Sequence, residues 1–175
     1  GLMCSAIISD TLLFRSPTCT PFDVEAAKRL ATIAGIECES YAREMFAAGS
    51  DLQARTPEEI FYQDFKQFEF GDWNIGIGQI TSMSSEELGH IKQRLMPYME
   101  QVFAKHDADM VFFMLTDILS ESSELLCYGK GAAELIQEAF GQKVVQNSAL
   151  LPGVVSRKKQ LVPSFMAAIN RMTMV

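Results

Sequence analysis

The chain has 175 residues, of which 48% are hydrophobic and 21% charged, and its formal net charge at pH 7 is −7. This length suits one domain, or one domain with part of another, and the composition is that of a folded globular protein. The negative charge disfavours binding to nucleic acid or to an anionic membrane, and no apolar run approaches the roughly 20 residues that a membrane-spanning helix needs.

The four cysteines are far apart in the sequence and none forms a C-x-x-C pair: Cys4, Cys19, Cys38 and Cys127. This spacing excludes a zinc ribbon and gives no disulfide framework. Reduced thiols are the rule in the cytosol, so we expect a cytoplasmic protein. The chain begins inside an apolar stretch without a signal pattern, from which we expect a truncated form of a longer protein.

The N-terminal third of the chain is expected to be mostly helical. Residues 3–9 are small and apolar and could form the end of a helix or a buried strand. Thr20 and Asp23 can form a capping box, which predicts a helix start, and Gly35 is a typical helix end. A second helix is expected over residues 38–48, followed by a linker-like stretch.

Strands and helices alternate in the rest of the chain. The expected strands are residues 64–70, 73–80, 109–115, 124–128 and 143–147, and the expected helices start at residue 56 and cover residues 86–105, 131–140 and 160–172. The first two strands are expected to form a hairpin. The predicted fold class is therefore α/β, a mixed β-sheet flanked by α-helices and preceded by a mostly helical segment.

The densest positive charge lies in residues 156–160, with the sequence SRKKQ, which we call the basic motif. A guanidinium fork beside a compact ammonium suits phosphate, and the N-terminus of the helix that follows favours anions. The residues alone leave two interpretations open, a phosphate-binding site and a solvated basic turn. A nucleic-acid site is disfavoured because the motif is a single cluster in an acidic chain.

Two further charged residues are candidates for a site. Asp10 follows an apolar segment and could bind a hard divalent cation, although an aspartate at such a place is more often a helix cap. Lys66 lies in a predicted strand, where it could face a site or simply solvent. The residues alone favour the structural interpretation for both.

Other familiar site patterns are missing from the sequence. The two histidines, His90 and His106, lack metal-ligand spacing, and there is no G-x-x-x-x-G-K-[ST] phosphate loop. Residues 76–78 (GIG) lack the third glycine of a dinucleotide fingerprint. The chain therefore carries no complete catalytic apparatus that the sequence can identify.

Three segments, in the same order along the chain, resemble the family II inorganic pyrophosphatases. Residues 6–18 (AIISDTLLFRSPT) resemble the last motif of their N-terminal DHH domain, and residues 64–68 (DFKQF) resemble the start of their C-terminal DHHA2 domain. Residues 151–160 (LPGVVSRKKQ) contain their signature S-R-K-K-Q. The resemblance covers essentially the whole chain.

This resemblance implies a function and a role for each candidate. The parent would hydrolyse pyrophosphate to two phosphates with a dimanganese centre and would be a homo-oligomer. Asp10 would be one carboxylate ligand of that centre, Arg157 and Lys158 would bind the pyrophosphate oxygens, and Lys66 would add charge from the opposite wall. The upstream histidine and aspartate motifs of the family are absent, so the isolated chain is expected to be inactive.

The resemblance also implies a division into domains. Residues 1–36 would be the C-terminal end of the DHH domain, residues 37–55 a linking helix with a hinge near 49–55, and residues 56–175 the DHHA2 domain. Residues 59–64 (EIFYQD) suggest the subgroup whose parents carry regulatory CBS domains. Two alternatives remain, an exopolyphosphatase of the same superfamily and a non-catalytic phosphate-binding or interaction module.

Overall fold

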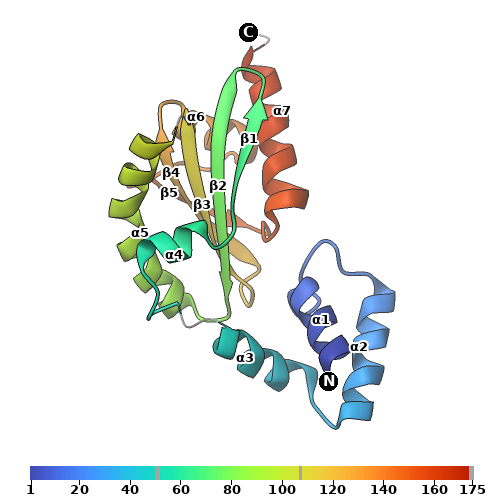
Figure 1. Ribbon diagram of the computed structural model, residues 1–175. Helices are drawn as coiled ribbons and strands as arrows, with labels where there is room; N and C mark the ends of the chain where they lie inside the picture. Colours follow the sequence, from blue (N-terminus) through green and yellow to red (C-terminus); the bar gives the residue numbers. More distant parts are fainter. Residues whose placement is uncertain (50–51, 107, 174–175) are drawn as a thin grey trace.

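The computed structural model describes residues 1–49, 52–106 and 108–173. They form two parts, a helical lobe (residues 1–49) and a sheet domain (residues 52–173), which lie side by side (Figure 1). The hinge predicted near residues 49–55 includes residues 50 and 51, which lie outside the described residues. The α/β class and the helical N-terminal part predicted from the sequence are confirmed.

The helical lobe contains α1 (Leu2–Asp10), α2 (Pro21–Ala34) and α3 (Cys38–Gly49). The alternative left open for residues 3–9 is resolved in favour of a helix. The capping box of α2 forms as predicted, since Thr20 Oγ1 accepts from the Asp23 N–H and Asp23 Oδ2 accepts from the Thr20 N–H. The three helices share a small apolar core made of Cys4, Ile8, Leu13, Ala31 and Ala42.

In the described part of the chain, five strands form one mixed sheet in the order β1-β2-β3-β4-β5. They are β1 (Phe65–Phe70), β2 (Trp73–Ser82), β3 (Met110–Asp117), β4 (Ser122–Gly129) and β5 (Ser148–Pro152). Only β2 and β3 run parallel, and the long helix α5 (Ser85–Lys105) provides the crossover that this pairing requires. The carboxyl ends of β2 and β3 therefore meet at one edge of the sheet, the edge that faces the helical lobe in Figure 1.

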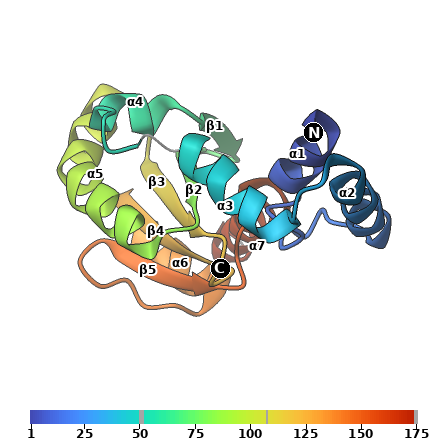
Figure 2. The same ribbon diagram turned by 90° about the horizontal axis from the view of Figure 1, so that it is seen from below.

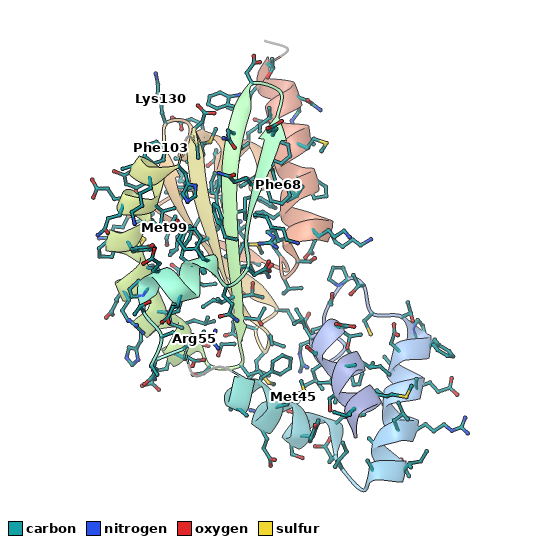
Figure 3. All side chains as sticks on the ribbon, in the orientation of Figure 1. Met45, Arg55, Phe68, Met99, Phe103 and Lys130 are labelled. Carbon is teal, nitrogen blue, oxygen red and sulfur yellow. The ribbon has the colours of Figure 1, made fainter. Side chains whose placement is uncertain are left out.

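Helices cover both faces of the sheet. One face packs against α5 and α4 (Pro57–Tyr62), and Met99 and Phe103 point from α5 towards the strands (Figure 3). The other face packs against α6 (Ala132–Phe140) and α7 (Val162–Thr173), the red helix in Figure 1. Because β3 is central and covered on both sides, its apolar run lacks polar alternation.

Two glycines in β2 allow aromatic rings to approach the sheet closely. A Cβ atom added at Gly76 would lie 2.6 Å from the Phe65 ring, and one added at Gly78 would lie 2.4 Å from the Phe113 ring. The alternation of glycine with isoleucine in this strand thus reflects packing rather than nucleotide binding.

The last predicted strand is wrong. Residues 143–147 were expected to form it, but the strand β5 lies at Ser148–Pro152, paired antiparallel with β4. Gln146 (φ 50°) and Asn147 (φ 58°) are both left-handed, and the bridge between Val145 and Ser148 closes a tight turn around them. The chain therefore reverses direction at residues 146–147, where an extended strand was predicted.

The two parts of the chain contact each other directly. Met83, from the loop between β2 and α5, packs against the apolar core of the helical lobe. Arg15 Nε of the lobe lies 3.6 Å from Glu121 Oε1 in the turn between β3 and β4. Within the described ranges, no helix is long and apolar enough to cross a membrane.

Candidate functional site

A cleft of about 700 Å³ separates the helical lobe from the sheet domain. The carboxyl end of β2 and the basic motif form one wall, and the chain after α1 together with the end of α3 forms the other. Figure 2 shows α3 between the sheet domain and α1. Carboxyl ends of parallel strands are the usual place for ligands in open α/β sheets. The residues that line the cleft are Ser9, Asp10, Leu12, Ser16, Thr18, Met45, Phe46, Leu52, Gln63, Asp64, Gln79, Ile80, Thr81, Val155, Ser156, Arg157, Lys158 and Lys159.

The basic motif folds as a widened helix start. Residues 157–161 form a single π turn, η1 (Arg157–Leu161), ahead of α7, so the predicted helix begins three residues earlier than expected. Ser156 Oγ accepts from the Lys159 N–H at 3.2 Å, and Gln160 Oε1 accepts from the Ser156 N–H at 3.0 Å. This is the logic of a capping box, lengthened by one residue because the π turn is wider. The first and last residues of S-R-K-K-Q thus fix the conformation of the three cations between them.

A chain of polar side chains anchors the segment that leads into the basic motif. Gln79 Nε2 donates to Thr116 Oγ1 at 3.1 Å and to the Val155 carbonyl at 3.2 Å. Ser123 Oγ donates to the Val154 carbonyl at 2.7 Å and lies 2.8 Å from Thr116 Oγ1. Since Ser123 uses its single proton on that carbonyl, Thr116 donates to Ser123. Residues of three strands thus hold the backbone beside the cleft.

Arg157 is buried, with its side chain only 7% exposed. Its Nη1 donates to the carbonyls of Asp64 (2.5 Å) and Ile77 (3.1 Å), and its Nη2 donates to Asp64 Oδ1 (2.7 Å). Such a guanidinium is held in one orientation at the cleft wall rather than free to reach into solvent.

Lys158 and Lys159 are exposed and line the cleft. In the part of the chain that the structure describes, neither lies within ion-pair distance of a carboxylate. They stand at the start of η1, where the N-terminal helix dipole adds to their positive charge. An anion in the cleft would meet two exposed lysines beside one fixed guanidinium.

Asp10 is the last residue of α1 and lies, exposed, on the opposite wall of the cleft. It is one carboxylate, whereas a two-metal centre needs several ligands. Among the described residues, no three His, Cys, Asp or Glu side chains come together as a metal-binding group. The residues present therefore do not hold such a centre, although Asp10 could supply one ligand to it.

The turn that follows Asp10 is left-handed over three bulky residues, Leu12 (φ 49°), Leu13 (φ 52°) and Phe14 (φ 69°). Each costs about 1–2 kcal/mol relative to an ordinary conformation. The cost is offset by the burial of Leu13 in the lobe core and by Thr11, whose Oγ1 donates to the Ile7 carbonyl and accepts from the Phe14 N–H. The strained turn shapes the cleft wall next to Asp10.

Lys66 is not among the residues that line the cleft. It is exposed on β1 and pairs across the sheet with Ile77, whose carbonyl accepts from Arg157. Directly opposed residues share one face of a sheet, so Lys66 lies on the face that α7 covers. The structure thus brings Asp10, Arg157 and Lys158 to one cleft and places Lys66 next to the site of Arg157 but outside the lining.

Sequence reasoning missed three residues of the site, Asp64, Gln79 and Thr116. Asp64 belongs to the quoted DFKQF segment, yet nothing local indicates that it pairs with a residue 93 positions away. Gln79 was visible as a polar residue in the alternation of β2, which is the one signal that could have found it. His106 is not among the residues that line the cleft, and its Nε2 is hydrogen-bonded to the Tyr62 hydroxyl at 2.7 Å.

The fold and the site together define a domain of the α/β class with a cationic turn at the carboxyl edge of a mixed sheet. Residues 43–168 match the model of the DHHA2 domain. The chain belongs to the DHHA2 family.

Relatives with names that describe an activity match almost the whole chain. A Clostridium acetobutylicum protein assigned as a manganese-dependent inorganic pyrophosphatase is 46% identical over 97% of this chain and 54% of its own length. A cobalt-dependent inorganic pyrophosphatase of Clostridium perfringens is 46% identical over 93% of this chain and 30% of its own length. The crystal structure of a Methanococcus jannaschii protein assigned to the family II inorganic pyrophosphatases superposes with a TM-score of 0.83 at 43% identity, covering 97% of this chain and 55% of that one. The chain thus spans about half, or less, of the length of these relatives.

Proposed function

We propose that this chain is the substrate-binding C-terminal part of an inorganic pyrophosphatase that hydrolyses pyrophosphate to two phosphates. The observation that carries the proposal is the cleft, where Lys158 and Lys159 are exposed beside the fixed guanidinium of Arg157. The names of the relatives, which match 93–97% of the chain, support the same reaction.

The chemistry of this reaction suits the residues in the cleft. Pyrophosphate hydrolysis is a phosphoryl transfer, in which positioning and charge neutralisation dominate. Lys158 would bind the phosphate oxygens and neutralise charge as the leaving phosphate departs, with Arg157 as a fixed donor at its side. Lys66, outside the lining, would contribute only if the lobe or its own side chain moves.

Manganese, the metal named for one relative, would supply hydroxide and polarise the attacked phosphate. In this chain Asp10 would provide one ligand, and the others would come from the part of the longer relatives that the chain does not span. We therefore propose that the chain is inactive by itself. We also propose that it works in the cytoplasm, as part of a homo-oligomer.

A chimera tests the proposal, in which residues 1–175 replace the matched part of the Clostridium acetobutylicum relative. With Mn²⁺, the chimera should release phosphate from pyrophosphate, whereas the isolated chain should not. Lys158→Ala should lower kcat/KM about a hundredfold. The matched control is Lys130→Ala, because Lys130 is an exposed lysine at the far end of the sheet from the cleft (Figure 3).

Each contrary result has a distinct meaning. Activity of the isolated chain would show a complete metal site that the described residues do not reveal. A chimera that releases phosphate from long polyphosphate in preference to pyrophosphate would replace the proposed substrate. Equal effects of Lys158→Ala and Lys130→Ala would remove the basic motif from the binding site.

A further inference from the structure

Three of the five N–H donors of the Arg157 guanidinium are already bonded to groups of its own chain. Both hydrogens of Nη1 go to main-chain carbonyls, those of Asp64 and Ile77, and Nη2 donates to the Asp64 carboxylate. A guanidinium binds carboxylate and phosphate through the same donors. A phosphate that accepts the same Nη2 hydrogen therefore competes with the carboxylate of Asp64.

The two kinds of contact differ in how firmly they are held. The carbonyls belong to the backbone just before β1 and in the middle of β2, so they fix the guanidinium whatever the carboxylate does. The Asp64 side chain contacts Arg157 through one oxygen only and is 48% exposed. Water can take over the solvation of such a carboxylate at little cost when it leaves. Positioning of Arg157 thus rests on the carbonyls, and the carboxylate is the replaceable partner.

The charge balance of the cleft points in the same direction. Its lining carries three cations, Arg157, Lys158 and Lys159, and two carboxylates, Asp10 and Asp64, so the net charge is one positive. Asp64 lies on the same wall as the cations. Its charge opposes any anion that enters, and its removal would double the net positive charge.

We propose that Asp64 is an internal competitor for the anion site, occupying the Nη2 edge of Arg157 until a phosphate group of the substrate displaces it. This inference rests on the proposed function, since it assumes that the cleft binds phosphate or pyrophosphate. It assigns to Asp64 a role in setting the affinity of the cleft. It also assigns two states to Arg157, which both keep the carbonyl bonds and differ in whether Nη2 donates to Asp64 or to the substrate.

The test is a calorimetric titration of the 175-residue chain with pyrophosphate, in the absence of metal and at low ionic strength. Asp64→Asn and Asp64→Ala should both bind pyrophosphate about tenfold more tightly than the unchanged chain, because they remove an opposing charge and a competing acceptor. Asp72→Asn is the matched control, since it removes the same charge at the β1–β2 turn, outside the cleft lining, and should change the affinity less than about twofold.

A second background separates competition from simple repulsion. In Arg157→Lys the charge remains but the second donor group of the fork is lost, so Asp64→Asn should gain much less affinity there. An equal gain in both backgrounds would show that Asp64 acts by charge alone and would overturn the competition. The melting temperature of each variant shows whether it is folded. If Asp64→Ala is not folded, the affinity of Asp64→Asn alone tests the inference.

The remaining outcomes distinguish this inference from the function on which it rests. If the unchanged chain binds pyrophosphate and Lys158→Ala weakens the binding, but Asp64→Asn does not tighten it, the inference fails and the proposed function stands. If Asp64→Asn weakens the binding, Asp64 positions Arg157 instead. If neither the unchanged chain nor Asp64→Asn binds, both the inference and the proposed anion cleft are wrong.

Discussion

Replacing Arg157 by alanine should destabilise the fold, whereas the same change at the neighbouring Lys158 should not. Arg157 is buried and makes three hydrogen bonds that join η1 to Asp64, the residue before β1, and to β2. A hydrogen bond to a charged group contributes about 1.5–3 kcal/mol, and breaking a fully buried ion pair costs about 3–5 kcal/mol. Because the partner carboxylate of Asp64 is half exposed and can be rehydrated, we expect a loss of about 2–3 kcal/mol.

Urea unfolding of the isolated chain measures this difference. With a slope of about 2 kcal/mol per molar urea, Arg157→Ala should lower the unfolding midpoint by about 1–1.5 M. Lys158 is exposed, so Lys158→Ala should change the free energy of unfolding by less than about 0.5 kcal/mol. A loss below about 1 kcal/mol for Arg157→Ala, or equal losses for both variants, would refute the reasoning. The result also matters for binding experiments, since lost binding in Arg157→Ala would partly report lost structure.

Three further predictions concern stability and reactivity. Gly78→Ala should lower the free energy of unfolding by about 1–3 kcal/mol, because the new methyl group would collide with the Phe113 ring. Gly89→Ala, where nothing lies within 4 Å of the new methyl group, should instead stabilise α5 by about 0.5–1 kcal/mol. Urea unfolding compares the two variants, and equal effects would contradict the packing argument. Thr116→Val should cost about 1–2 kcal/mol by the same assay, because one buried and one partly buried hydrogen bond lose their partner. A neutral effect would mean that the polar chain beside the cleft contributes no stability. Burial raises the pKa of the Cys127 thiol to about 11, so iodoacetamide at pH 8 should alkylate it only after unfolding. Mass spectrometry of native and urea-treated protein measures the labelling, and equal labelling of both would exclude a buried thiol.

Local signals in the sequence were enough to predict most of the fold. The capping boxes at Thr20 and Thr56 begin α2 and α4 as expected, because each satisfies backbone groups within four residues of itself. The hairpin of β1 and β2 and the buried strand β3 follow from apolar patterning. The exception, β5, depends on the left-handed turn at Gln146 and Asn147, where neither residue is a glycine that would have indicated it.

The site was predictable only in part, because its residues meet through long-range contacts. The basic motif was found from its charge, and its position at the cleft agrees with the phosphate-binding interpretation. Its internal arrangement was not foreseen, since the burial of Arg157 depends on Asp64, which is 93 residues away. Lys66 was expected on the opposite wall, whereas the register of β1 against β2 places it outside the lining; its role stays a prediction.

The packing of Met83 has a mechanical consequence. This residue belongs to the sheet domain by sequence, but its partly buried side chain packs against the apolar core of the helical lobe. Met83 follows directly after β2, and residues Gln79 to Thr81 near the end of that strand line the cleft. A rotation of the lobe therefore either extracts Met83 from its core or pulls on the end of β2. The lobe and the wall that carries the cations cannot move independently, and a displacement that begins at one is transmitted to the other through four residues of extended chain.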